Sequence, residues 1–126
     1  MKILFRLVPP PLLIVFFSTC SNNGGEKLIL KANNDWIKGR NHGAIEIFKS
    51  VLKKYPSGRP AAEALFRLGE IYHFSLNDSA QAISYFQEVM ELDKKGPFGF
   101  GAQKHIAEIW NLPLKILIKR LLNTKI

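Results

Sequence analysis

The chain has 126 residues, with 18 Lys and Arg against 10 Asp and Glu, and a formal net charge of +8. This length suits one small domain and excludes two full hydrophobic cores. An apolar fraction of 47% excludes a disordered chain, and the single Cys excludes a disulfide framework. The positive charge could indicate binding to nucleic acid or anionic lipid, so its position along the chain matters.

Residues 1–19 have the layout of a secretory signal peptide. Lys2 and Arg6 give a positive start, an apolar stretch follows, and small residues precede Cys20. The apolar stretch is shorter than the roughly 20 residues that a membrane span needs, and three consecutive prolines interrupt it. We therefore expect a cleaved export signal rather than a membrane-spanning helix.

The sequence FSTC, which ends at Cys20, resembles the lipobox of bacterial lipoproteins. The resemblance implies that Cys20 is acylated after cleavage, which would account for an unpaired thiol in an exported chain. Ser21 resembles the residue found in lipoproteins that are sent on to the outer membrane. Residues 20–25 are then expected to form the lipid-anchor Cys and a flexible tether. The alternative is an ordinary cleaved signal and a soluble exported adaptor with a free Cys.

Residues 26–111 contain an internal repeat. Residues 68–72 (LGEIY) match residues 106–110 (IAEIW) at a spacing of 38, and the same spacing relates Phe48 to Phe86. A period of 20 to 50 residues is typical of a solenoid. Apolar residues recur at helical spacing within each unit, and Gly, Pro and Asn separate the apolar stripes. The pattern predicts helix–turn–helix units over 26–56 and 57–94 and a partial unit over 95–111.

These units resemble the tetratricopeptide repeat, in which small and aromatic residues let two antiparallel helices pack closely. The resemblance implies an all-α fold, a short α-solenoid of about two and a half repeats. It assigns helix packing within the repeats to Ala44, Phe48, Leu68, Gly69, Tyr72, Ala82, Phe86, Ala107 and Trp110.

Tetratricopeptide repeats bind partners on a concave face lined by their first helices, so the resemblance also implies a protein-binding groove. The residues expected to line it are Trp36, Phe66, Glu70, His73, Phe74 and Glu108. The aromatic side chains would anchor a peptide or a helix, and the charges would set its register. For each aromatic residue the alternative is packing against the neighbouring repeat.

The sequence predicts a non-catalytic chain with no metal, cofactor or small-molecule substrate. His42, His73 and His105 lack neighbouring ligands at metal-binding spacing, and no Ser, Cys or carboxylate pair has an activating context. The glycine-rich residues 96–101 lack the Lys-Ser/Thr ending of a phosphate loop. A hydrolase with its site in the repeat groove is the enzymatic alternative.

Residues 112–126 depart from the repeat pattern and form a basic segment with apolar residues at helical spacing. We expect a terminal helix that folds back over the third unit. The alternatives are an amphipathic helix on anionic lipid and a shortened gene whose repeat array lacks a cap. We also expect marginal stability, or a partner that covers the open end.

The surplus positive charge lies mostly in the signal and in this last segment, and the repeat body is close to neutral. This distribution argues against the alternative of a cytosolic module that binds nucleic acid. The long inter-repeat loop and Cys20 together resemble periplasmic outer-membrane lipoproteins of the BamD and Tol-Pal-associated repeat-protein kinds. That resemblance implies a scaffold, anchored on the periplasmic face of the outer membrane, that binds other envelope proteins during envelope assembly or maintenance.

Overall fold

The computed structural model describes residues 23–124, and this part of the chain is helical, without a β-strand. The predicted signal peptide and Cys20 lie outside the described residues. The elements in chain order are α1 (Asn23–Ile37), α2 (Asn41–Lys54), α3 (Gly58–Glu70), the π-helical turn η3 (Ile71–Ser75), α4 (Ser79–Leu92) and α5 (Pro97–Asn123). The all-α, solenoid-like fold predicted from the repeats is confirmed.

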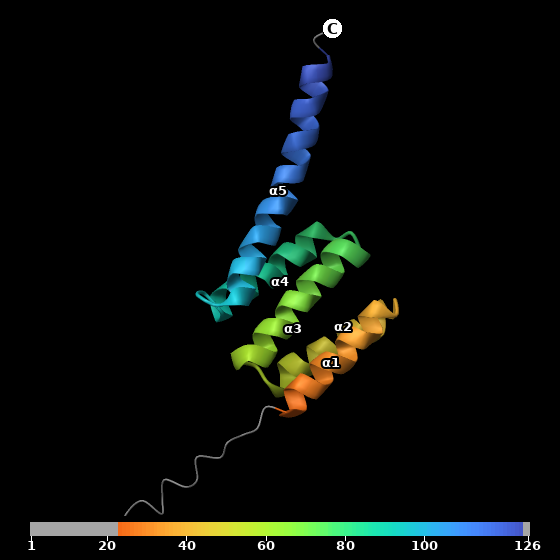
Figure 1. Cartoon of the computed structure of the whole chain (residues 1–126), viewed down its shortest axis with the longest axis vertical. Helices are drawn as coiled ribbons and strands as arrows, with labels where there is room; N and C mark the ends of the chain where they lie inside the picture. Colours follow the sequence, from red (N-terminus) through yellow and green to blue (C-terminus); the bar gives the residue numbers. More distant parts are fainter. Residues whose placement is uncertain (1–22, 125–126) are drawn as a thin grey trace, which may run out of the picture.

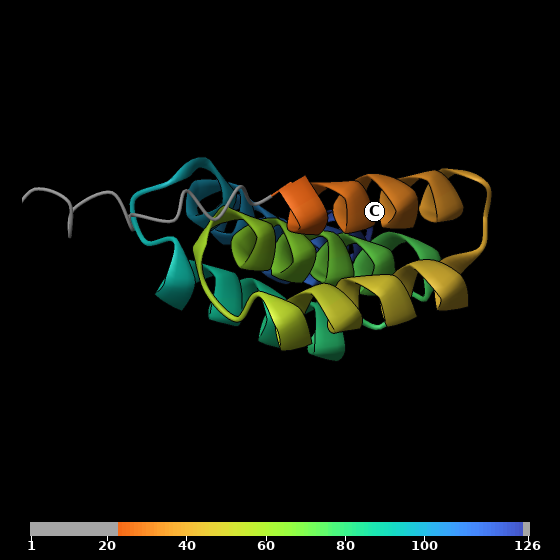
Figure 2. The same ribbon diagram turned by 90° about the horizontal axis from the view of Figure 1, so that it is seen from below.

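The helices are stacked in the order in which they occur along the chain. α1 packs against α2, α3 packs against α4, and α4 packs in turn against α5. In the view of Figure 2, α2 and α4 lie below α1 and α3, so first helices and second helices form two layers. In Figure 1 the C-terminal half of α5 extends beyond all the other helices.

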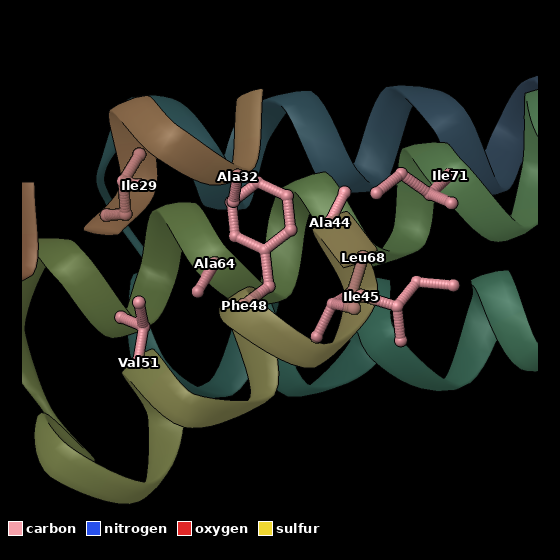
Figure 3. Packing of buried hydrophobic residues seen from close by; sticks show 9 residues of the cluster. All are labelled: Ile29, Ala32, Ala44, Ile45, Phe48, Val51, Ala64, Leu68 and Ile71. Carbon is pink, nitrogen blue, oxygen red and sulfur yellow. The ribbon is translucent and has the colours of Figure 1, made fainter. Parts of the chain in front are cut away.

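Two hydrophobic clusters hold the stack together. The first lies between α1, α2 and α3, where the ring of Phe48 points toward Ala32 and both residues are fully buried (Figure 3). The second lies between α3, α4 and α5 and is centred on Phe86, which is also fully buried. A Cβ atom on Gly69 would lie 2.5 Å from Cε1 of Phe86, so the absence of a side chain at Gly69 lets the ring reach the α3 backbone.

The first helix begins earlier than the sequence predicts. Asn23 opens α1, and Gly25 is buried against Tyr55 and Pro60. A Cβ atom on Gly25 would lie 3.1 Å from Cβ of Pro60. The glycine that indicates a flexible tether in the sequence therefore serves close packing, and the last three residues of the predicted tether (23–25) belong to the helix.

The spacing between the small residues of the first and second helices is one residue longer in the second unit than in the first. Ala32 and Ala44 are twelve residues apart, whereas their equivalents Gly69 and Ala82 are thirteen apart. The additional residue is accommodated in η3, where the backbone N–H of Leu76 donates to the carbonyl of Ile71 at 3.1 Å. A π-helical turn is the usual form of a one-residue insertion in a helix, and such turns often occur at functional sites.

The glycine-rich residues 96–101 form a close helix junction. At the start of α5, the carboxylate Oδ2 of Asp93 accepts hydrogen bonds from the backbone N–H groups of Phe98 (3.1 Å) and Gly99 (3.4 Å). Gly99 is buried where any Cβ atom would meet the carbonyl oxygen of Asp93. An acidic side chain at this position satisfies free N–H groups and complements the helix dipole.

The end of the chain differs from the predicted fold-back. α5 continues without a turn as far as Asn123, with Pro113 inside the helix, and residues 110–124 are exposed. The turn inside each of the two earlier helix pairs contains a residue with positive φ, Gly39 (+76°) between α1 and α2 and Asn77 (+53°) between η3 and α4. After Pro113 there is no Gly, and strong helix formers continue the helix. None of the described helices combines the length and apolarity that crossing a membrane requires.

Candidate functional site

Polar and aromatic side chains meet where α3 and η3 pack against α5. At the centre of this junction lies His105 of α5, whose ring is stacked on Phe86 with centroids 5.1 Å apart and an interplanar angle of 13°. The rings of Phe66 and Phe74 lie 5.6 Å from it on other sides. The imidazole is therefore held in one place by aromatic rings from α3, η3 and α4.

Charged groups continue from this imidazole toward the surface. Nε2 of His105 lies 3.6 Å from Oε1 of Glu70, and its Nδ1 lies 3.5 Å from Oε2 of Glu108. The other oxygen of Glu70 accepts a hydrogen bond of 2.7 Å from the guanidinium of Arg67. Because the Glu70 side chain is only 14% exposed, these two partners compensate the removal of its charge from water.

An exposed aromatic ring and a hollow lie beside this polar cluster. Phe74 is 60% exposed, and its ring contacts the imidazole of His73 with centroids 4.5 Å apart. A hollow of about 280 Å³ opens next to them, and it is lined by His73, Glu108, Asn111, Leu112 and Lys115. We call this surface, formed by Glu70, His73, Phe74, His105 and Glu108, the α3–α5 face.

The groups that the α3–α5 face offers to a ligand are the exposed ring of Phe74 and the carboxylate of Glu108, whose side chain is 53% exposed. The Nδ1 atoms of His73 and His105 are buried and make no hydrogen bond to another described residue. The face can therefore bind a ligand that places an apolar side chain against Phe74 and polar groups beside that side chain.

Four of the predicted groove residues meet on this face, namely Glu70, His73, Phe74 and Glu108. The two remaining residues of the predicted groove lie elsewhere. Trp36 is half-buried against the first cluster, and its Nε1–H donates to Oγ of Ser75 at 3.0 Å, which ties α1 to η3. Phe66 packs inside the second cluster, with its ring centroid 5.7 Å from that of Phe98. For these two aromatic residues, packing against the neighbouring repeat describes the structure better than an open groove.

His105 is the residue of this face that the sequence analysis did not select. It lies one helical turn before Ile109, which is buried against the body. This spacing places both residues on the packed side of α5. Helical periodicity counted from Ile109, rather than a metal-ligand pattern, is the signal that would have identified it.

The residues predicted to pack the repeats separate into two groups. The first group is covered by other helices. Tyr72 is half-buried, with its ring centroid 5.4 Å from that of Tyr85. The fully buried members are Ala44, Phe48, Leu68, Gly69, Ala82 and Phe86. Ala107 is exposed and Trp110 is 66% exposed, which differs from the prediction. The physical reason is that α5 runs straight on, so that no second helix of a third unit covers them.

Tyr85 is the described residue whose pKa clearly departs from its ordinary value. Burial raises the pKa of this phenol above 10.0, and the nearby Tyr72 and Glu88 raise it further. Tyr85 packs against Tyr72 and does not belong to the residues of the α3–α5 face.

Other surfaces of the described residues offer less chemistry. A wide hollow of about 700 Å³ lies along α4, and its lining includes Leu65, Met90 and the exposed polar residues Gln87 and Glu88. Within residues 23–124, no group of three His, Cys, Asp or Glu side chains is placed to hold a metal ion. The α3–α5 face is therefore the best candidate for recognition.

Comparison with protein families identifies the central helix pair. Curated protein sequences give no match to this chain. Residues 62–95 match the family described as the tetratricopeptide repeat, and this range covers most of α3, all of η3 and α4, and the loop before α5. The matched segment contains Glu70, His73 and Phe74 of the α3–α5 face. The chain therefore contains a tetratricopeptide repeat, a helical module that generally mediates protein–protein interaction.

Proposed function

We propose that this protein is a lipid-anchored scaffold on the periplasmic face of the outer membrane, where it binds other envelope proteins through the α3–α5 face. The observation that carries the proposal is the exposed ring of Phe74 beside the mostly buried, ion-paired carboxylate of Glu70 and the exposed carboxylate of Glu108. An aromatic anchor beside fixed polar groups is typical of protein-binding surfaces.

The positions of these groups suit a helix or an extended peptide as the ligand. An apolar side chain of the partner would cover Phe74 and enter the adjoining hollow. A donor on the partner would pair with Glu108, whose side chain is 53% exposed. Because the rings around His105 hold the face rigid, little conformational entropy is lost when the partner binds.

The anchor is proposed from the sequence around Cys20. Only Ser21 and Asn22 separate Cys20 from α1. A chain extends by at most about 3.6 Å per residue, so an acylated Cys20 would hold the start of α1 within roughly 10 Å of the bilayer surface. The repeat would then act on membrane-proximal partners and would not sample the full width of the periplasm.

Metabolic labelling with a palmitate analogue tests the anchor. We expect the chain to be labelled and to sediment with outer membranes, and we expect Cys20→Ser to abolish both results. A processed chain that is unlabelled and remains in the soluble fraction would overturn the anchor and would favour the soluble exported adaptor.

A pair of variants tests the binding face. Phe74→Ala removes an exposed ring and should not unfold the repeat, whereas Gln87→Ala is a matched exposed change on α4. We expect Phe74→Ala to lower the yield of co-purified envelope proteins about tenfold or more, the effect of losing one hot-spot residue. Gln87→Ala should leave that yield unchanged. Equal yields from both variants would exclude the α3–α5 face as the binding surface.

A further inference from the structure

α5 carries an apolar stripe that no other described residue covers. Its members are spaced alternately three and four residues apart, and they are Ala107, Trp110, Leu114, Leu117 and Leu121. All five are exposed, and the four large side chains have 53% to 66% of their surface in water. This alternation is the pattern of the seam between two helices of a coiled coil.

The preceding repeat indicates what kind of ligand this stripe takes. By the 38-residue spacing, Ala107 and Trp110 correspond to Gly69 and Tyr72. Gly69 is covered by Phe86 of α4, and the ring of Tyr72 lies on Tyr85 of the same helix. In this molecule, therefore, the equivalent face of a first helix is a binding face for another helix.

The C-terminal half of α5 has the apolar pattern of such a second helix. Leu114, Ile118 and the pair Leu121-Leu122 have the same spacing as Ala82, Phe86 and the pair Val89-Met90 of α4. This half cannot cover the stripe of its own helix, because α5 is continuous through Pro113. A second chain of the same sequence can supply it, since each copy then offers both the stripe and the segment that covers it.

We propose that the stripe of α5 is occupied by α5 of a second copy of this chain, in an antiparallel, two-fold symmetric pair. The shape of the molecule permits this arrangement. The other helices pack beside the N-terminal half of α5, whereas its C-terminal half projects free of them (Figure 1). An antiparallel pair keeps the two bodies at opposite ends, whereas a parallel pair would bring them together at one end.

Chemical crosslinking of the purified full chain in mild detergent tests the pairing. Each variant is made with Cys20→Ser, so that the introduced Cys is the only thiol. With a short bismaleimide, Leu114→Cys near the two-fold axis should give mainly dimer. The matched variant Ile116→Cys, which is exposed on another side of α5, should give at least fivefold less.

A mixture of two variants tests the direction of the pair. Ala107→Cys and Leu121→Cys should each fail to crosslink alone, and they should give dimer when they are mixed. Dimer formed by Ala107→Cys alone would contradict the antiparallel arrangement. Absence of dimer with Leu114→Cys would overturn the proposal, and protection of that thiol by anionic vesicles in the same preparation would assign the stripe to a lipid surface.

Discussion

At the residue scale, each described repeat crossing depends on a small residue under an aromatic ring. Gly69 lies under Phe86 in the second unit, and Ala32 lies beside Phe48 in the first. These contacts could be predicted from sequence, because small and aromatic residues recur at a fixed period. The contact of His105 with Glu70 could not be predicted, because it joins residues 35 positions apart whose approach depends on how α5 packs.

Gly69→Ala should destabilise the protein even though Ala favours helices. The new Cβ would lie 2.5 Å from a fully buried ring that cannot move aside. Overpacking of this kind costs about 1–3 kcal/mol, which outweighs the gain of about 1 kcal/mol in helix propensity. Urea unfolding followed by circular dichroism measures the difference.

Gly43→Ala is the matched control for this change. Its Cβ would meet only Oδ2 of Asp35 at 3.5 Å, an ordinary contact, in an exposed part of α2. We expect the control to be neutral or stabilising. A destabilisation of equal size at both glycines would show that close approach of Phe86 is not what requires Gly69.

Tyr85→Phe should flatten the loss of stability at alkaline pH. Burial, Tyr72 and Glu88 raise the pKa of Tyr85 in the folded protein, whereas the unfolded chain releases this proton near 10.0. The folded state therefore holds more protons, and the free energy of unfolding falls as pH rises through the folded pKa. Unfolding measured from about pH 9 to 11 should give a steeper fall for the original chain than for the variant. Parallel curves would contradict this assignment.

At the scale of elements, the sequence pattern predicts the two helix pairs but does not predict the length of α5. Apolar stripes separated by Gly, Pro and Asn predict α1 to α4. The same rules place a break at residues 111–113, because Pro usually ends a helix. α5 continues because no other described residue packs against residues 112–124 to stabilise a helix that turns back, and because strong helix formers follow Pro113. Sequence rules for a local break cannot detect the absence of a tertiary contact.

The start of α5 should depend on Asp93. Its carboxylate accepts the N–H groups of Phe98 and Gly99, so Asp93→Ala leaves both without this partner. We expect a loss of about 1 kcal/mol, the usual cost of removing a helix-capping side chain. Glu91→Ala, at a side chain that is 80% exposed, should change stability by less than about 0.5 kcal/mol. In the same urea titration, a loss of stability for Asp93→Ala no greater than that for Glu91→Ala would contradict the capping role of Asp93.

At the scale of the whole molecule, the described residues form a small stack of helices with a recognition face at one junction and an uncovered helix beyond it. The tetratricopeptide repeat over residues 62–95 establishes the type of module. The α3–α5 face and the stripe lie on different sides of α5, so a partner and a second copy can bind together. Lipid attachment at Cys20 would hold this assembly at a membrane surface.

The central claim is that the α3–α5 face binds another protein. A photo-reactive amino acid placed at Phe74 in living cells tests it most directly, with the same group at Gln87 on α4 as the matched position. We predict that light gives a discrete crosslinked product at Phe74, that its mass differs from that of a dimer of this chain, and that Glu70→Gln reduces it. A product of the same mass and yield at Gln87, or none at Phe74, would contradict the claim.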